Sequence, residues 1–268
     1  MQLTDNAHQS AARALFEAEQ TGVQIGLLSR RYPQMDLDDC YAIQTRLIAL
    51  KQAAGRQMVG WKIGLTSRAM QMALGIDMPD SGVLFDDMIF ADGATVPAGR
   101  FIAPRVEAEI AFVTRAALAG GAVTRADVLA ATAYVAPCLE ILDTRIRRVD
   151  PETGATRKIF DTVSDNAANA GVVLGAQRHA ADAVDLRWVG AIVRRDGAVE
   201  ETGLGAGVLD DPVSGLVWLA RRMAQYGQRI EAGQIVLSGS FIRPVECPAG
   251  AQIAADFGAF GQVAIGFA

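Results

Sequence analysis

The hydrophobic pattern of the chain changes near residue 58, and this change limits the folds available to it. Before that point the apolar residues recur at helical spacing, as in a segment that Asp36 can cap and Gly55 can end. The residues of that segment at helical spacing are Cys40, Ile43, Leu47 and Leu50. Residues 1–57 are therefore predicted to form an N-terminal helical portion.

From Met58 onward the apolar runs are short and are broken by Gly, Pro and Asp, as expected for strands. Two later helices are well signalled by capping residues, from Thr124 to Ala131 and from Asp211 to Gly227. The strand-like runs are 59–65, 82–90, 101–113, 186–194, 234–238 and 262–267. Because strands and helices do not alternate regularly, we expect a mixed α+β fold, with residues 58–268 packed against the helical portion as one compact unit.

The stretch from Arg145 to Asn169 is polar and shows neither strand nor helix periodicity. It is predicted to be a long loop. Long structured loops in compact proteins are often functional, although a mobile surface loop explains the pattern equally well.

Composition narrows the possible partners. A net charge of −5 provides no basic surface for nucleic acid. The three cysteines form no CxxC pair, so neither a disulfide framework nor a zinc site is predicted. The first 16 residues lack the apolar core of a signal peptide, and no run of about 18 apolar residues indicates a membrane span. We therefore expect a cytoplasmic protein that acts on a small molecule.

Two glutamates alternate with apolar residues between Phe101 and Val113. If this segment is a strand, Glu107 and Glu109 share one face. The apolar residues of the other face are Val106, Ala108, Ile110 and Phe112. For this pair alone, a solvated strand face is the favoured interpretation.

A third glutamate, Glu140, stands inside an apolar run, where an ionised carboxylate without a partner is costly to bury. Arg145 or Lys158 can supply a salt bridge. Alternatively, three carboxylates without nearby Cys or His match the oxygen shell of a hard cation, and Mg²⁺ or Mn²⁺ would suit them better than Zn²⁺.

Other candidate residues carry weaker signals. Lys62 lies in an apolar run that can lower the pKa of its amine or aim it at an anionic substrate, although a lysine reaching out from an edge strand fits too. The polar run 161–171 suits hydrogen bonding to a carboxylate or water, but also capping and turns. His8 and His179 are expected at the surface, so no histidine-dependent triad is predicted.

Six segments together resemble the hydratase and decarboxylase branch of the fumarylacetoacetate hydrolase superfamily, which acts in meta-cleavage degradation of aromatic compounds. They are Trp61–Ser67, Pro104–Glu109, Leu139–Asp143, Phe160–Gly171, Glu200–Gly203 and Gly239–Phe241. The resemblance spans almost the whole chain. Within the branch, segments 150–154, 158–161 and 239–244 are most similar to hydratases of 2-oxohept-4-ene-1,7-dioate in homoprotocatechuate degradation.

The resemblance implies a fumarylacetoacetate-hydrolase-like mixed β-roll as the catalytic domain. It also implies a homo-oligomer with Mg²⁺ or Mn²⁺ on Glu107, Glu109 and Glu140. The implied reaction adds water to 2-oxohept-4-ene-1,7-dioate to give 4-hydroxy-2-oxoheptane-1,7-dioate, which makes the protein a hydro-lyase with a small 2-oxo dicarboxylic acid as its substrate.

Lys62 and Asp80 are the residues expected to transfer protons as the double bond moves into conjugation and water adds at C4. Asp80 stands in a Gly-rich turn before a strand, so it can also be a plain turn aspartate. Further side chains are expected to orient water or to bind the second carboxylate of the substrate. These predicted substrate-binding residues are Arg105, Lys158, Asp161, Ser164, Asn166 and Asn169.

Three alternatives remain open at this point. A 4-oxalocrotonate-type decarboxylase and a 2-hydroxypenta-2,4-dienoate hydratase belong to the same branch. A non-catalytic partner subunit of a pathway enzyme is an alternative of another class. A C–C bond hydrolase is not favoured, because hydrolases of the superfamily activate water with a His–Glu pair and no histidine here is suitably placed.

Overall fold

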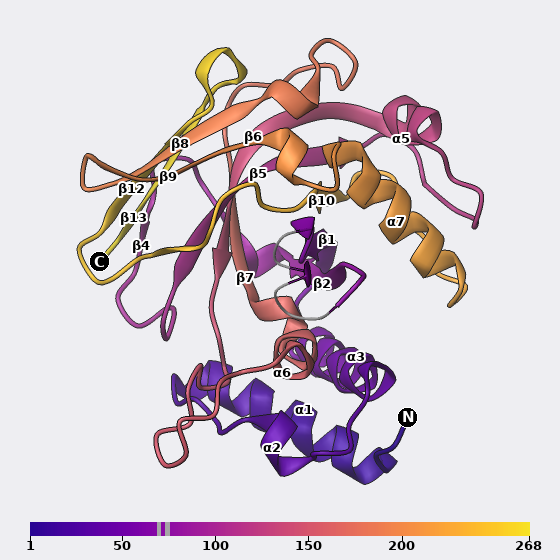
Figure 1. The fold of residues 1–268 in the computed structure, drawn as a ribbon, viewed down its shortest axis with the longest axis vertical. Coiled ribbons are helices and arrows are strands. Elements are labelled where there is room, and N and C mark those ends of the chain that lie inside the picture. The colour runs from indigo at the N-terminus through magenta and orange to yellow at the C-terminus, as the bar shows by residue number, and fades with distance from the viewer. Residues whose placement is uncertain (69–70, 73–75) are drawn as a thin grey trace.

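The computed structural model describes residues 1–68, 71–72 and 76–268. Two curled sheets lie next to each other, and a layer of helices packs below them (Figure 1). The largest buried apolar cluster joins the two sheets, with Ile63, Val106 and Ile110 of one packed with Val193 and Ile265 of the other. The mixed α+β architecture is therefore the one predicted.

The first sheet carries the candidate site. Over the described residues it has eight strands, and most neighbours are antiparallel, apart from the parallel pairs β1–β10 and β3–β7. In spatial order the strands are β2 (Asp80–Phe85), β1 (Met58–Gly64), β10 (Ile235–Leu237), β5 (Arg105–Thr114), β6 (Thr132–Leu142), β7 (Asn169–Leu174) and β3 (Ile89–Phe90), with β11 (Val245–Glu246) paired to β5.

The second sheet covers one side of the first. Its strands, again in spatial order, are β4 (Thr95–Val96), β13 (Gln262–Phe267), β12 (Gln252–Asp256), β8 (Gly190–Arg195) and β9 (Ala198–Leu204). Helices α5 (Arg125–Ala131) and α7 (Pro212–Ala224) flank the sheets, capped by Thr124 and Asp211 as the sequence predicts. Residues 186–188, predicted as the start of a strand, instead form a 3₁₀ turn ahead of β8.

The N-terminal residues are helical, as predicted. They form α1 (Asp5–Thr21), α2 (Leu28–Arg31) and α3 (Leu37–Ala53). The Asp36 carboxylate accepts a hydrogen bond of 2.9 Å from the Asp39 N–H, and the Asp39 carboxylate accepts one of 3.1 Å from the Asp36 N–H, which fixes the start of α3.

The segment predicted to be a long loop contributes to this helical layer. Residues Ile159–Ser164 form α6, and Ile146 and Val163 are buried among the side chains of the N-terminal helices. The prediction of a loop throughout 145–169 is therefore wrong. A helix of six residues is too short to show a clear hydrophobic period, and its burial comes from tertiary packing.

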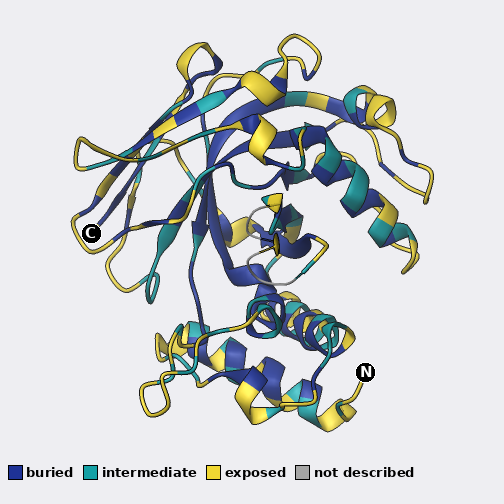
Figure 2. Ribbon diagram, in the orientation of Figure 1, coloured by how far each residue is buried: buried dark blue, intermediate teal, exposed yellow. Residues whose placement is uncertain are grey.

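Strand β5 is enclosed on both faces, as Figure 2 shows for the central strands of the molecule. The predicted apolar face of β5 is fully buried between the sheets. The opposite face, which carries Glu107 and Glu109, also looks inward; Glu109 is 1 % exposed and Glu107 is half-buried. The interpretation of these glutamates as a solvated strand face is therefore wrong.

The histidine prediction also needs correction. His8 is buried, and its imidazole lies 2.8 Å from the Asp39 carboxylate, which secures α1 to α3. His179 is half-buried and stacks on the ring of Phe260. Neither residue belongs to the carboxylate-bearing face of the first sheet. Among the described residues, no helix combines the length and the apolar character needed to cross a bilayer.

Candidate metal centre

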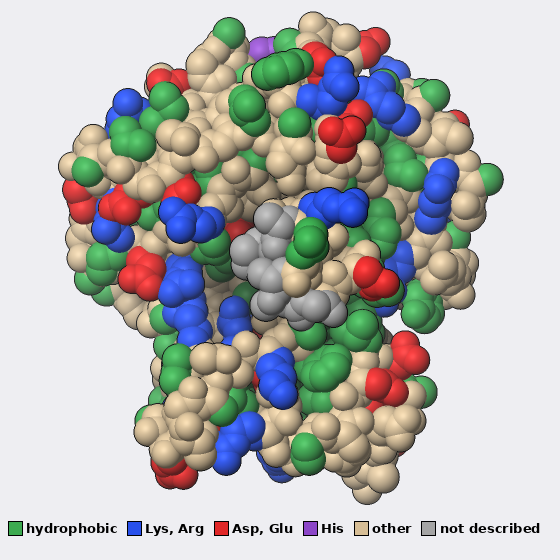
Figure 3. Space-filling model, viewed as in Figure 1, with side chains coloured by type: hydrophobic (Ala, Val, Ile, Leu, Met, Phe, Trp, Pro, Cys, Tyr) green, Lys and Arg blue, Asp and Glu red, His purple; other side chains and the backbone are tan. Residues whose placement is uncertain are grey.

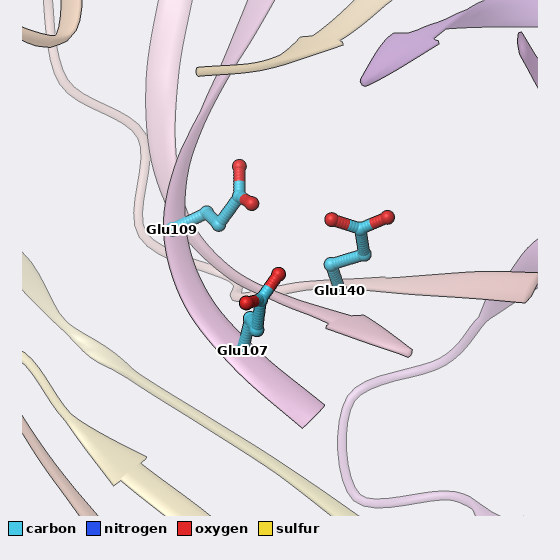
Figure 4. Close-up of side chains that lie close together, drawn as sticks. All are labelled: Glu107, Glu109 and Glu140. Carbon is cyan, nitrogen blue, oxygen red and sulfur yellow. The ribbon is translucent and has the colours of Figure 1, made fainter. Parts of the chain in front are cut away.

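Three carboxylates meet on the inward face of β5 and β6. Glu107 stands directly opposite Glu140 in the antiparallel register, so both side chains leave the sheet on the same face, and Glu109 follows two residues further along β5. One oxygen from each carboxylate lies within 4.8 Å of the others. Figure 4 shows the three carboxylates directed into one shared space.

Lys62 and Asp80 reach the same face from the edge of the sheet. Lys62 on β1 stands beside Leu237 of β10, and Asp80 on β2 stands opposite Gly64 of β1. The Lys62 ammonium lies 3.3 Å from Glu140 Oε1. A Cβ placed on Gly64 would overlap Asp80 Oδ1 and stand 3.0 Å from Lys62 Nζ, so both groups border this glycine.

The negative charge of the three glutamates exceeds the positive charge that Lys62 supplies beside them. Burial raises the pKa of Glu107 to about 8, helped by the charge of Glu140. Burial together with the neighbouring carboxylates raises the pKa of Glu109 well above its ordinary range. The pKa of Glu140 is also raised by burial, which Lys62 offsets only in part. A divalent cation would relieve this repulsion.

The hydrogen bonding of the cluster agrees with a cation site. Within the described part of the chain, both oxygens of Glu140 and Oε1 of Glu109 are buried without a hydrogen-bond partner. The other Glu109 oxygen accepts a hydrogen bond of 2.7 Å from the Gly239 N–H, which orients the carboxylate. Burial holds the pKa of the adjacent Cys138 thiol well above its usual value, so the available donors are carboxylate oxygens. Such a donor set fits a hard divalent cation.

Lys62 is the basic partner of Glu140, and the two partners predicted from sequence are not. Arg145 is buried elsewhere, with its Nε 2.6 Å from Asp165 Oδ1, and Lys158 is exposed. Lys62 is 3 % exposed, so it does not reach out to solvent. Burial would lower the pKa of Lys62, but the charges of Glu140 and Asp80 outweigh burial and raise it. The predicted lowering of this pKa is therefore wrong.

Asp80 is also buried, which excludes a plain turn aspartate at the surface. Its Oδ1 has no hydrogen-bond partner among the described residues, and burial raises its pKa despite the nearby charge of Lys62. The structure thus brings together all five residues predicted to bind metal or to transfer protons. What these residues do chemically remains a prediction at this stage.

The predicted substrate-binding residues are more scattered. Arg105 shares the inward face of β5 with Glu107, and its Nη2 lies 2.7 Å from Glu246 Oε1. The Asp161 carboxylate accepts hydrogen bonds from the Ser29 N–H, the Ser29 hydroxyl and the Lys158 N–H at 2.9, 2.7 and 2.9 Å. These contacts tie the starts of α2 and α6 together, so Asp161 is left out of the proposed site.

The remaining predicted residues, Asn166, Asn169 and Ser164, are all buried. Asn166 Oδ1 accepts a hydrogen bond from the Val83 N–H at 2.8 Å, and its Nδ2 donates one to the Val83 carbonyl at 2.9 Å. The Asn166 side chain thus pairs with the backbone of β2 as a neighbouring strand would. Asn169 is buried, and its Oδ1 has no hydrogen-bond partner in the described structure. Ser164 is buried on α6 at the contact with α3.

Sequence reasoning missed Arg148 and Arg157. Val149 pairs with Thr156 in an isolated bridge, and this pairing brings the two arginines together near Arg105. Both lie in the polar stretch, where no pattern separates them from the neighbouring Lys158.

Comparison with known proteins places the chain among enzymes of 2-oxo acid metabolism. No protein-family model matches it. It is 48% identical over 262 residues to 2-oxo-hept-4-ene-1,7-dioate hydratase from Escherichia coli, covering 98% of each chain. It is also similar to the structure of 4-oxalocrotonate decarboxylase from Pseudomonas putida G7 complexed with magnesium and adipate, with a TM-score of 0.92, 32% identity and 99% of each chain covered.

The fold extends to more distant proteins. A putative fumarylacetoacetate hydrolase family protein from Yersinia pestis CO92 matches with a TM-score of 0.57 and 12% identity, over 79% of this chain and 93% of that one. At that identity the match concerns the fold alone. The β-roll that carries the three carboxylates is therefore common to this chain and to that family.

Proposed function

The chain belongs to the hydratase and decarboxylase branch of the fumarylacetoacetate hydrolase superfamily, and we propose that it is a divalent-metal-dependent hydro-lyase acting on 2-oxohept-4-ene-1,7-dioate. The product would be 4-hydroxy-2-oxoheptane-1,7-dioate. The observation that carries the proposal is the cluster of Glu107, Glu109 and Glu140 facing Lys62 and Asp80, in which three buried carboxylate oxygens lack a hydrogen bond within the described structure. The choice of substrate is supported by the 48% identity to the hydratase from Escherichia coli.

The three glutamates would hold Mg²⁺ or Mn²⁺, because the donors are carboxylate oxygens. When bound, such a cation supplies electron withdrawal from a 2-oxo acid, which makes its C3 protons easier to remove. The protein's own contribution is a buried face that excludes water from most of the site and fixes the three carboxylates through the β5–β6 register.

Lys62 and Asp80 are proposed to move protons on the substrate carbon chain. The Lys62 amine and the Asp80 carboxyl group are both buried beside the carboxylate cluster, and both are group types that exchange protons with a bound substrate. Because both border Gly64, the two groups lie close enough to act on adjacent parts of one small molecule. This pairing would shift the double bond into conjugation before water adds at C4.

Replacing Gly64 with Ala tests this pairing. The new methyl group would overlap Asp80 Oδ1 and crowd Lys62 Nζ, so both groups must shift while the backbone stays in place. We expect kcat to fall roughly 10- to 100-fold, because a displacement of about 1 Å in an active site has effects of that size. The measurement is steady-state hydration, with thermal unfolding as the check on folding.

Gly121→Ala is the matched control. Gly121 has open space around the position of a Cβ and its φ is not positive, so this variant should match the wild type in kcat and in Tm. Unchanged kcat in a folded Gly64→Ala variant would contradict the proton-transfer role of the Lys62–Asp80 pair.

The product identifies the reaction. Purified protein with Mg²⁺ should convert 2-oxohept-4-ene-1,7-dioate into a species heavier by one water, as seen by mass spectrometry. Release of CO₂ from a vinylogous 2-oxo diacid would instead support the decarboxylase alternative. The similarity to 4-oxalocrotonate decarboxylase is the reason to test for it. Assembly without turnover of any branch substrate would favour a non-catalytic partner subunit.

The proposed setting is a cytoplasmic homo-oligomer with no nucleic-acid or membrane partner. Size-exclusion chromatography with light scattering tests the assembly, and a mass equal to one chain would contradict it.

A further inference from the structure

Three arginines gather beside the carboxylate cluster, and the proposed metal and proton-transfer chemistry uses none of them. Arg105 lies two residues before Glu107 on the same face of β5. Arg148 and Arg157 lie on the two arms of a hairpin that returns past the end of that strand. Figure 3 shows Lys and Arg side chains gathered on this face of the molecule, around the zone where the helical layer meets the sheets.

Backbone contacts hold the three arginines together. The Arg157 N–H donates to the Arg148 carbonyl at 2.9 Å, beside the Val149–Thr156 bridge. Arg148 Nη2 in turn donates to the Ala103 carbonyl at 2.9 Å, just ahead of Arg105. The hairpin is therefore fastened to the segment that leads into the metal-binding strand.

Each of the three guanidinium groups has one buried nitrogen that makes no hydrogen bond within the described structure. Arg105 Nε, Arg148 Nε and Arg157 Nη1 are buried and have no hydrogen-bond acceptor among the described residues. Buried donors of this kind are normally paired, and leaving them unpaired is costly. Three such donors on neighbouring arginines point to an acceptor that comes from outside the chain.

The charges around the arginines support the same conclusion. Burial and the repulsion of Arg105 and Arg157 lower the pKa of Arg148 to about 10, so the guanidinium stays charged at neutral pH but is poorly compensated. The carboxylates that act on these arginines already have other partners or are exposed. Asp143 accepts from the backbone of 102–103, Asp161 from Ser29, and Asp165 from Arg145. Glu246, the partner of Arg105, is largely exposed. An anion would satisfy both the surplus charge and the free donors.

Arg157 also lies near the proton-transfer pair. Its charge acts on Asp80, and it acts on Arg105 as well, so its guanidinium lies within electrostatic range of both sides of the site. Arg105 and Glu107 are separated by two residues of strand, roughly 7 Å. An extended chain with a carboxylate at each end can span such a separation.

We propose that Arg157, with Arg148 and Arg105, binds the second carboxylate of the substrate and so makes the site selective for 2-oxo dicarboxylic acids over 2-oxo monocarboxylic acids. The proposal rests on the proposed function for the identity of the substrate. In this proposal the main ligand of the second carboxylate is Arg157, which is half-buried, and not the predicted Lys158, which is exposed at the start of α6.

Binding of two inert ligands tests the selectivity without any turnover. 2-Oxoheptanedioate and 2-oxoheptanoate have the same chain length and differ only in the distal carboxylate. In calorimetry with the Mg²⁺-loaded protein, the wild type should bind the diacid roughly 10- to 100-fold more tightly, as expected for charge-assisted hydrogen bonds. Arg157→Met should remove most of this preference while leaving the affinity for the monoacid unchanged, and Arg157→Lys should keep part of it.

Arg148→Met is the second variant, and Arg187→Met is the control. Arg187 is exposed and pairs with Asp185 in a surface turn, so its loss should leave the preference unchanged. A wild type without preference for the diacid, or Arg157→Met and Arg148→Met variants that both retain it, would overturn the proposal. If the preference is present and depends on Arg157, but no hydration occurs, the specificity proposal stands and the proposed reaction fails.

Discussion

Replacing Glu140 with Gln is expected to lower hydration turnover by on the order of a thousandfold while leaving the protein folded. The amide keeps the shape of the side chain but removes the charge of the one carboxylate whose two oxygens both lack a hydrogen-bond partner among the described residues. The variant should also bind Mg²⁺ much more weakly, because the central ligand of the cluster becomes a neutral donor. Steady-state kinetics and calorimetric titration with Mg²⁺ measure the two effects.

The folded state of Glu140→Gln is expected to survive for an electrostatic reason. Losing Glu140 deprives Lys62 of its ion pair, but it also removes the repulsion that raises the pKa of Glu107 and Glu109. Glu231→Gln is the matched control, because Glu231 pairs with Arg229 at the surface and contacts Thr114, at the end of β5 opposite to Glu107. If Glu140→Gln retained wild-type turnover and Mg²⁺ affinity, the assignment of the metal ligands would be wrong.

Replacing Lys62 with Met is the second change with a large expected effect. We expect kcat to fall roughly 100- to 10,000-fold, the range typical of a lost proton-transfer group. Mg²⁺ affinity should not fall, because the ammonium 3.3 Å from Glu140 repels a metal ion and its removal leaves the three carboxylates in place. This separation of turnover from metal affinity distinguishes Lys62 from a residue that only supports the metal ligands.

Lys62→Arg separates proton transfer from charge. Arginine keeps the positive charge beside Glu140, but it does not give up its proton at working pH. Restored turnover in Lys62→Arg would mean that Lys62 acts as a charge alone. A Lys62→Met variant with nearly normal kcat would remove Lys62 from the mechanism entirely.

The three glutamates could be predicted from the sequence because their signals are local. Alternation along 101–113 places Glu107 and Glu109 on one face of a strand, and the apolar run around Glu140 predicts its burial. Capping residues likewise predict the starts of α3, α5 and α7. The resemblance to the superfamily was needed to bring these segments together, because the pairing of Glu107 with Glu140 depends on strand register across more than 30 residues.

Other features depend on packing between distant segments, and the sequence carries no local signal for them. The partner of Glu140 is Lys62, three strands away in the sheet, whereas Arg145 lies close in sequence but pairs with Asp165. Asp161 looks like a binding residue in a polar run, yet its carboxylate is occupied by Ser29 of α2. Arg157 and Lys158 are adjacent basic residues, and only the fold shows that Arg157 is half-buried while Lys158 is exposed.

The most direct test of the account is a Mg²⁺ titration of protein stripped with EDTA, with calorimetry and hydration of 2-oxohept-4-ene-1,7-dioate followed on the same sample. We expect no turnover in the stripped protein and recovery in proportion to the binding of one cation per chain. Both should be lost when Glu107, Glu109 and Glu140 are all replaced by Gln. Full turnover by the stripped protein, or undiminished cation binding by the triple variant, would contradict it.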